Sequence, residues 1–213
     1  MTEPDVTLTD YGLAIECALF TYLVFRSRKK PQLLRIWFAL FFGSLSLAAL
    51  LGGTVHGFFL DTQATAHTFL WQATLLAIGV TALSLWAIGA NIQFSVVIAH
   101  WITITAAVEF IAYCIIVLLV TQNYYVVIFN YLPAVVFLLI VFGLVYVRTR
   151  ETRVLVGFLG FGLTLVAAWV QQERIALHPV YFNHNANYHL IQAIALLLIF
   201  GSSRGLILAQ TTR

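Results

Sequence analysis

Charged residues are scarce in this chain, and that scarcity defines its class. Aspartate, glutamate, lysine and arginine together make up 9% of the 213 residues, whereas hydrophobic residues make up 62%. An average soluble domain carries about 25% charged residues. The composition therefore excludes a soluble globular domain. The net charge of +3 does not indicate nucleic-acid binding, because no surface of basic and aromatic residues is left outside the apolar segments.

Cysteine and lysine are also rare, and each shortage excludes a further class of protein. The two cysteines, Cys17 and Cys114, both lie in apolar stretches, which excludes a secreted disulfide scaffold. The two lysines, Lys29 and Lys30, lie in a polar connection between apolar stretches. No apolar stretch therefore offers an amine for a retinal Schiff base, which excludes a light sensor of the rhodopsin type.

Apolar runs, in contrast, cover most of the chain. Crossing a bilayer as a helix takes about 20 apolar residues, and seven runs approach or exceed that length. They are Leu8–Phe25, Ile36–Leu60, Thr68–Ile92, Phe94–Val120, Tyr124–Val147, Val154–Val170 and Tyr188–Leu208. The sequence therefore predicts an all-α polytopic membrane protein, a bundle of seven transmembrane helices that forms a single domain over residues 1–213.

The basic residues predict how the bundle is oriented. With seven crossings, ten of the eleven lysines and arginines fall on one side of the membrane, and Arg174 alone falls on the other. Positively charged loops stay in the cytoplasm. We therefore expect a protein of the plasma or inner membrane with its N-terminus outside and its C-terminus in the cytoplasm. The acidic, polar residues before Leu8 do not resemble a removable signal peptide.

This topology brings four of the six histidines to one level near the outer face. His56 lies near the outer end of the second run, His67 opens the third, and His184 and His189 open the seventh. Ionisable groups in membrane segments are costly and usually mark a functional site. Neutral imidazoles from several helices at one depth predict a metal site, and zinc suits such ligands.

The expected zinc ligands are His56, His189 and His184, with His67 as another possible third ligand. His184 and His189 are five residues apart and diverge on a regular helix, so His184 must lie on a cap, which Asn183 or Asn185 could form. Asp61 could act as a ligand or as a base.

Two glutamates lie deeper in the apolar runs, Glu16 in the first and Glu109 in the fourth. Either could orient an imidazole from behind. In the fifth run Pro133 is expected to kink the helix and open a cavity beside it.

Seven helices, a histidine late in the second and a histidine pair opening the seventh resemble the CREST superfamily, which includes alkaline ceramidases and adiponectin-type receptors. That family's motif has a serine four residues before the first histidine and His-x-x-x-His on the last helix. Here His56 and His189 match, Gly52 stands in place of the serine, and Asn185 stands four residues before His189 with His184 beside it. His67 occupies the position where the family has an aspartate, and Asp61 comes earlier.

The resemblance implies a zinc-dependent membrane hydrolase that cleaves a lipid amide or ester near the extracytoplasmic face. The substrate would be a lipid of the surrounding bilayer. Asp61 or Glu16 would be the general base, and His67 would stabilise the tetrahedral intermediate.

Two other functions are compatible with the same residues. A seven-helix receptor, transporter or structural protein could hold a metal without chemistry. A b-type haem carrier could use two facing histidines such as His56 and His189, and a visible absorption spectrum would reveal it.

Overall fold

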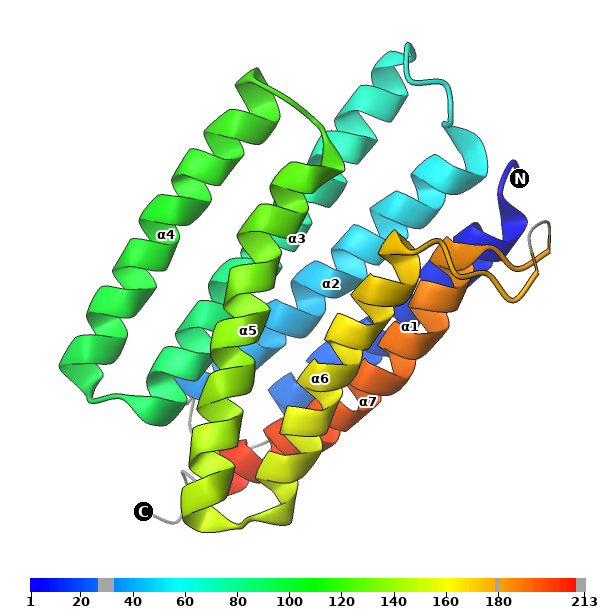
Figure 1. Ribbon diagram of the computed structural model, residues 1–213. Helices are drawn as coiled ribbons and strands as arrows, with labels where there is room; N and C mark the ends of the chain where they lie inside the picture. Colours follow the sequence, from blue (N-terminus) through cyan, green and yellow to red (C-terminus); the bar gives the residue numbers. More distant parts are fainter. Residues whose placement is uncertain (27–32, 179–180, 210–213) are drawn as a thin grey trace.

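The computed structural model describes residues 1–26, 33–178 and 181–209, and in these it is all-helical apart from connections and one isolated β-bridge (Figure 1). Each of the seven helices is long and apolar enough to cross a membrane. They are α1 (Pro4–Arg26), α2 (Leu33–Phe58), α3 (Thr65–Gln93), α4 (Val96–Leu119), α5 (Tyr124–Thr149), α6 (Thr152–Gln172) and α7 (His184–Ala209). The predicted seven-helix bundle is confirmed, and the chain is an integral membrane protein.

The helices extend beyond the apolar runs at several ends. α1 begins at Pro4, four residues before the predicted Leu8, and α7 begins at His184, four residues before the predicted Tyr188. Apolarity sets how much of a helix fits in lipid, whereas caps set where the helix begins. At α7 the side chain of Asn183 accepts hydrogen bonds from the backbone N–H groups of Asn185 and Ala186, at 2.9 and 3.2 Å. Asn183 is therefore the N-cap of α7, and of the two predicted candidates, Asn183 and Asn185, it is the first that caps the helix.

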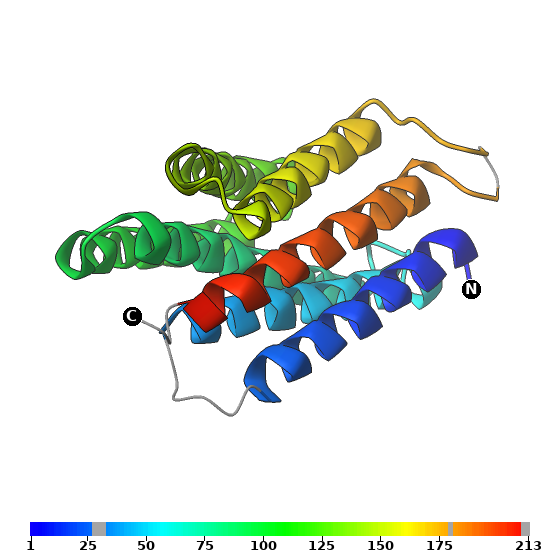
Figure 2. The ribbon, with the colours of Figure 1, turned by 90° about the horizontal axis from the view of Figure 1, so that it is seen from below.

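Six of the helices close into a ring. In order around it, α1 packs on α2, α2 on α3, α3 on α5, α5 on α6, α6 on α7, and α7 back on α1. α4 lies outside this ring, packed mainly against α3, and forms one edge of the molecule in Figures 1 and 2. The α1, α6 and α7 helices lie at the opposite edge.

Because successive helices run in opposite directions, the connections between them gather at two ends of the bundle. The N-terminal end holds the start of α1, the α2–α3 and α4–α5 connections, and the segment from α6 to α7. The C-terminal end holds the α3–α4 and α5–α6 connections and the last turn of α7 (Figure 1). The four histidines expected at one level all lie towards the N-terminal end.

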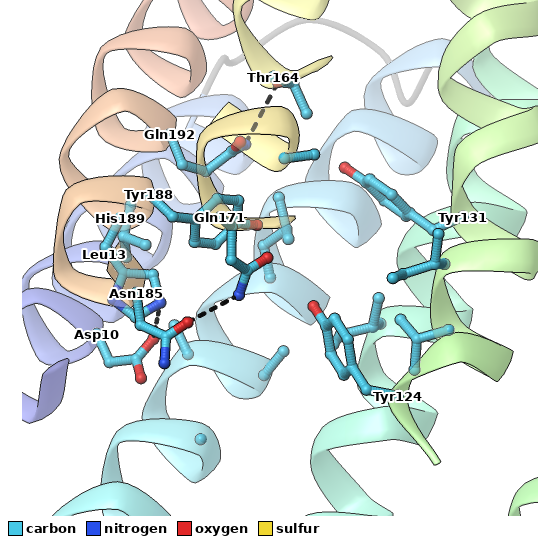
Figure 3. Close-up of a pocket in the computed structure, with 18 of the residues that line it drawn as sticks. Asp10, Leu13, Tyr124, Tyr131, Thr164, Gln171, Asn185, Tyr188, His189 and Gln192 are labelled. Carbon is cyan, nitrogen blue, oxygen red and sulfur yellow. Dashed lines mark hydrogen bonds and ion pairs between the residues drawn. The ribbon is translucent and has the colours of Figure 1, made fainter. Parts of the chain in front are cut away.

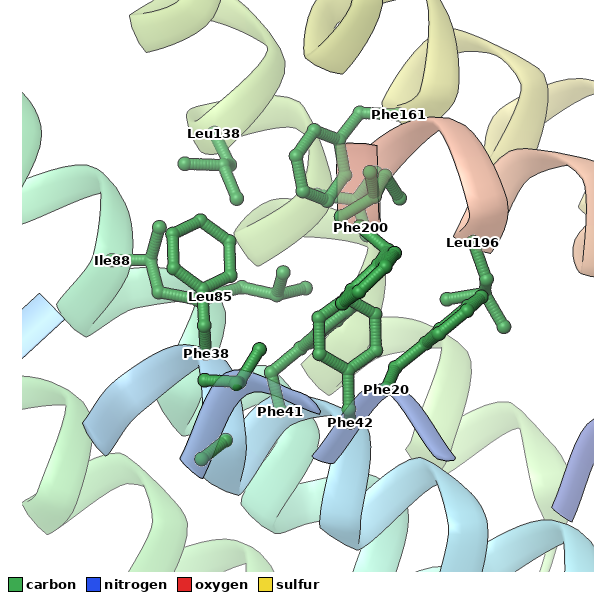
Figure 4. Close-up of a cluster of buried hydrophobic side chains, with 14 of the residues drawn as sticks. Phe20, Phe38, Phe41, Phe42, Leu85, Ile88, Leu138, Phe161, Leu196 and Phe200 are labelled. Atoms are coloured by element: carbon green, nitrogen blue, oxygen red, sulfur yellow. The ribbon is translucent and has the colours of Figure 1, made fainter. Parts of the chain in front are cut away.

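Phenylalanines fill the bundle towards its C-terminal end (Figure 4). The rings of Phe20 and Phe200 stack with centroids 4.2 Å apart, and Phe42 meets Phe20 edge-on at 5.4 Å. Phe38 and Phe41 are also fully buried. Close-packed aromatic rings of this kind leave little void, so the cavity of this protein must lie elsewhere.

The α1–α2 contact is close because of a glycine. A Cβ atom built on Gly53 would lie 2.8 Å from the Cβ of Asp10, and real Cβ atoms do not approach so closely. Gly53 thus lets the backbone of α2 reach α1 at the level of Asp10. The adjacent Gly52 is different, since a Cβ there would make ordinary contacts of 3.7 Å with the Asp10 carboxylate and with Thr74.

Candidate functional site

A cavity of about 640 Å³ lies inside the helix ring. Its lining comes from α1, α2, α3, α5, α6 and α7, and the lining side chains are mostly apolar. Leu132 and Tyr131 beside Pro133 are among them, so the cavity lies next to that proline as expected, although α5 is continuous through it. Polar side chains gather on the α1–α7 side: Asp10, Gln171, Asn185, Tyr188, His189 and Gln192 (Figure 3). His56, on α2, also lines the cavity. A volume of this size suits a small organic ligand.

The central contact of the site joins His189 on α7 to Asp10 on α1. The imidazole Nε2 lies 3.2 Å from the carboxylate Oδ1, and both side chains are about nine-tenths buried. Buried charged groups are costly unless they are paired, so each of these two side chains makes the burial of the other tolerable. Sequence analysis did not single out Asp10 as a site residue.

Thr9 fixes the orientation of the His189 ring. Its hydroxyl lies 2.9 Å from Nδ1 and also within 3.0 Å of the carbonyl oxygens of Asp5 and Val6. A hydroxyl has one proton. When that proton is donated to the helix carbonyls, the hydroxyl oxygen accepts from Nδ1–H of His189. We therefore assign the Nδ1 proton to the Thr9 contact, which leaves Nε2 directed at Asp10 and the cavity.

The second imidazole is held in the same manner. His56, in the last turn of α2, has its Nδ1 2.5 Å from Oε2 of Glu3. The backbone also joins these segments, since Glu3 N donates to the carbonyl of His56 and Thr2 N donates to that of Gly57. With Nδ1 held by a carboxylate, Nε2 is the nitrogen left for other partners. His56 lines the same cavity as His189.

Glu3 and the first two turns of α1, which follow it directly, therefore organise the site. Glu3 contacts His56 on α2, while Thr9 and Asp10 hold His189 on α7. Asp5 accepts a hydrogen bond from the backbone N–H of Asn183, which caps α7. The signal that could have revealed this role is Asp10 itself, an acid inside the first apolar helix, where an ionisable side chain indicates a functional contact.

The other predicted site residues are not brought into the cavity lining. His184 is the first residue of α7, and His67 contacts the carbonyl oxygen of Phe59 through its Nδ1 at 2.6 Å. Asp61 is exposed in the α2–α3 connection, where it accepts from the backbone N–H of Gln63. Glu16 is half-buried on α1 but does not line the cavity. The structure thus joins His56 and His189 in one cavity and separates the remaining four.

Two of the three zinc ligands predicted from the sequence lie in this cavity. His56 and His189 are each held at Nδ1 by an acceptor, the arrangement typical of metal-binding histidines. Within the described residues, however, no three histidine, cysteine, aspartate or glutamate side chains are grouped so that they could hold a metal ion together. The two imidazoles fit a metal, and a third ligand is not in place beside them.

Tyrosine hydroxyls form the wall opposite the His189–Asp10 pair. Tyr124 and Tyr131, about two turns apart on α5, point their hydroxyls across the cavity in Figure 3. On the α7 side Gln192 donates to the hydroxyl of Thr164 at 3.4 Å, and Gln171 donates to Asn185 at 3.1 Å. The cavity therefore offers hydrogen-bond donors to a polar group held between its two walls.

Comparison with known proteins assigns the chain to a family. No curated protein matches it, and no solved structure matches it. Residues 6–207 match the model of a family of unknown function, DUF6962. Since this match covers nearly the whole chain, the chain belongs to that family.

Proposed function

We propose that this protein is a membrane hydrolase that cleaves an amide or ester bond of a lipid held in the cavity. The observation that carries the proposal is the pairing of His189 with Asp10 beside a second held imidazole, His56, in an otherwise apolar cavity. Enzymes place titratable groups in this way when a proton must be moved during the reaction.

The shape and chemistry of the cavity favour a lipid. An acyl chain would occupy the apolar part between α2, α5 and α6, and its carbonyl would lie between the tyrosine wall and the His189–Asp10 pair. Tyr124 or Tyr131 would donate a hydrogen bond to the carbonyl oxygen, since each hydroxyl faces the cavity (Figure 3). A site inside a bundle of membrane-spanning helices is reached most directly by a molecule already dissolved in the bilayer.

The expected orientation supports the same assignment. The ten-to-one distribution of basic residues favours a cytoplasmic location for the C-terminal end of the bundle. His56, His189 and Asp10 would then lie near the extracytoplasmic face, within reach of outer-leaflet lipids.

Zinc would be held by Nε2 of His56 and Nε2 of His189. Bound there, it would supply the Lewis acidity that activates water and polarises a carbonyl. Thr9 and Glu3 keep both rings oriented through Nδ1. Asp10, whose carboxylate lies beside Nε2 of His189, would accept the proton that the attacking water loses and would return it to the leaving amine or alcohol as the amide or ester bond breaks.

The test combines metal analysis with lipid turnover on the purified full chain. We expect about one zinc per chain, zinc-dependent release of fatty acid from a panel of ceramides, phospholipids and N-acyl amines, and loss of both in His56→Ala and His189→Ala. His100→Ala is the matched control, since His100 is exposed on α4, outside the ring. Full metal retention in the double variant of His56 and His189 would refute the metal assignment. No release from any lipid would refute the hydrolase.

A second candidate is a lipid-binding protein without chemistry, and one observation favours it. Both ring nitrogens of His189 already have protein partners, Thr9 and Asp10. In this case His189 would fix the structure and the polar head of a bound lipid. Native mass spectrometry separates the candidates: a lipid that copurifies intact, is lost in Tyr131→Phe and is never turned over supports binding alone.

A further inference from the structure

A carboxyl group in the middle of α4 faces outward. Glu109 is exposed, and along the helix it lies about 20 Å from Val96 and about 15 Å from Leu119 at 1.5 Å per residue. These distances are too long for the side chain to reach either membrane surface. Among the described residues Glu109 has no hydrogen-bond or ion-pair partner. An ionisable side chain left in hydrocarbon is costly, so a polar partner outside the chain would stabilise this position.

The helix that carries Glu109 is the least enclosed of the seven. Of the residues in its membrane window, 17% are buried, against 67% for α3. α4 packs on the bundle through one buried stripe, which consists of Ala99, Ala106, Tyr113 and Val117. In this stripe Tyr113 donates its hydroxyl to the carbonyl of Leu75 on α3 at 2.8 Å. Phe110 and Cys114 flank the stripe on one side and pack in a small apolar cluster with residues of α3 and α5. Glu109 lies on the other side of the stripe.

The outward side of α4 carries a regular seam. Starting from Ile98, its positions follow at alternating intervals of four and three residues, and all but the half-buried Ile102 are exposed. The seam consists of Ile98, Ile102, Thr105, Glu109, Ala112, Ile116 and Leu119. This is the a/d spacing with which two parallel helices pack into each other's holes. Thr105 and Ala112 are small and flank Glu109, which lets two helices approach at the level of the carboxyl group.

We propose that α4 is the interface through which two copies of this chain associate in the membrane. Copies inserted with the same orientation and related by a two-fold axis along the membrane normal bring equal seam positions together. Glu109 then faces Glu109 of the second copy, and the two carboxyl groups hydrogen-bond through a shared proton. The seam is self-complementary in this arrangement, since the small Thr105 and Ala112 meet their own copies and the one ionisable residue, Glu109, meets itself. A polar residue at a single core position also fixes the register of a helix pair.

This inference is independent of the proposed hydrolase, because α4 contributes no residue to the cavity lining. The first experiment is disulfide cross-linking of the full chain in native membranes. In a background with Cys17→Ala and Cys114→Ala, we expect Ala112→Cys to give an oxidised dimer. Ile15→Cys should give little, although Ile15 is 71% exposed on α1, and it serves as the matched control. Equal cross-linking at the two positions would overturn the proposal.

The second experiment measures the dimer fraction in nanodiscs by mass photometry. The wild type should be mainly dimeric, and Glu109→Gln should remain so, because side-chain amides also pair across such a seam. Glu109→Leu should lower the dimer fraction at least several-fold, with its thermal unfolding as a monomer unchanged. Ala112→Phe, which keeps Glu109 but blocks close approach, should act similarly. A monomeric wild type, or a Glu109→Leu variant as dimeric as the wild type, would contradict the inference.

Discussion

The two ends of the bundle differ in packing: one is densely filled with aromatic rings, and the other encloses a cavity. Towards the C-terminal end, rings from five helices, α1, α2, α5, α6 and α7, interlock (Figure 4). The ring centroids of Phe20 and Phe200 lie 4.2 Å apart, and those of Phe142 and Phe161 lie 5.3 Å apart. Towards the N-terminal end the same helices enclose a cavity of about 640 Å³ with a buried His–Asp pair (Figure 3). The packed end holds the helices together so that the hollow end can keep an open site. The packed aromatic core and the candidate site thus lie in different halves of the same helices.

The largest effect on stability is expected from the packed end. Phe38→Ala removes a fully buried ring that does not line the cavity. It should lower the free energy of unfolding by about 3–5 kcal/mol, the usual cost of a large cavity in a packed core. Leu45→Ala is the control, since Leu45 already borders empty space, and it should cost clearly less. Unfolding in mixed micelles followed by circular dichroism measures both, and equal losses would show that the two ends do not differ in packing.

Gly53 tests whether the hollow end depends on a close helix approach. A methyl group at Gly53 would meet Asp10 and Tyr11, at 2.8 and 3.1 Å from its carbon. Gly53→Ala should therefore push α1 from α2 and destabilise the protein by about 1–3 kcal/mol, as overpacking does. Because the shift moves Asp10, bound metal and lipid turnover should fall as well. A variant as stable and active as the wild type would mean that α1 and α2 adjust without cost.

Sequence reasoning succeeded where apolarity alone decides the outcome and failed where side chains from distant segments must meet. The seven helices follow from runs of hydrophobic residues, and the cap at Asn183 from local hydrogen bonding. Which helices lie beside α7 depends on tertiary packing. The apolar pattern of α1 does not predict that α1 is one of them. The sequence therefore predicts Glu16 or Glu109 as the group that orients an imidazole, whereas the structure supplies Thr9 and Asp10 to His189.

Asp10 and Glu16 provide a direct comparison between the observed partner and the one expected from sequence. Both are acids on α1, but only Asp10 contacts His189 and lines the cavity. Asp10→Asn should weaken metal binding and turnover by about 10–100-fold, the typical effect of removing a group that supports a metal-binding histidine. Glu16→Gln should leave both nearly unchanged. Zinc titration with a fluorescent competitor measures the affinities, and a larger loss in Glu16→Gln than in Asp10→Asn would reverse this assignment.

Thr9 tests how much the orientation of the ring contributes. Thr9→Val keeps the shape of the side chain but removes the hydroxyl that lies 2.9 Å from Nδ1 of His189. A single neutral hydrogen bond contributes about 0.5–1.5 kcal/mol, so turnover and metal affinity should fall by only a few-fold. Thr9→Ser restores the hydroxyl and should restore the activity. If Thr9→Val abolished turnover as His189→Ala does, Thr9 would act in the chemistry itself rather than by orienting the ring.

Gly52 is expected to give the smallest effect. It tests the position at which the predicted CREST motif would have a serine. A Cβ atom at Gly52 would have ordinary contacts at 3.7 Å with Oδ2 of Asp10 and with Thr74. Gly52→Ser should therefore fold normally, with Gly52→Ala as the control for added volume. The new hydroxyl would lie beside Asp10, one helical turn from His56, and could hydrogen-bond to that carboxylate. We expect a change in turnover of a few-fold at most, measured on the same lipid panel. A large gain specific to the serine variant would show that the carboxylate of Asp10 had lacked a donor. Unfolding of both variants would instead show that this level of α2 is packed as tightly as Gly53.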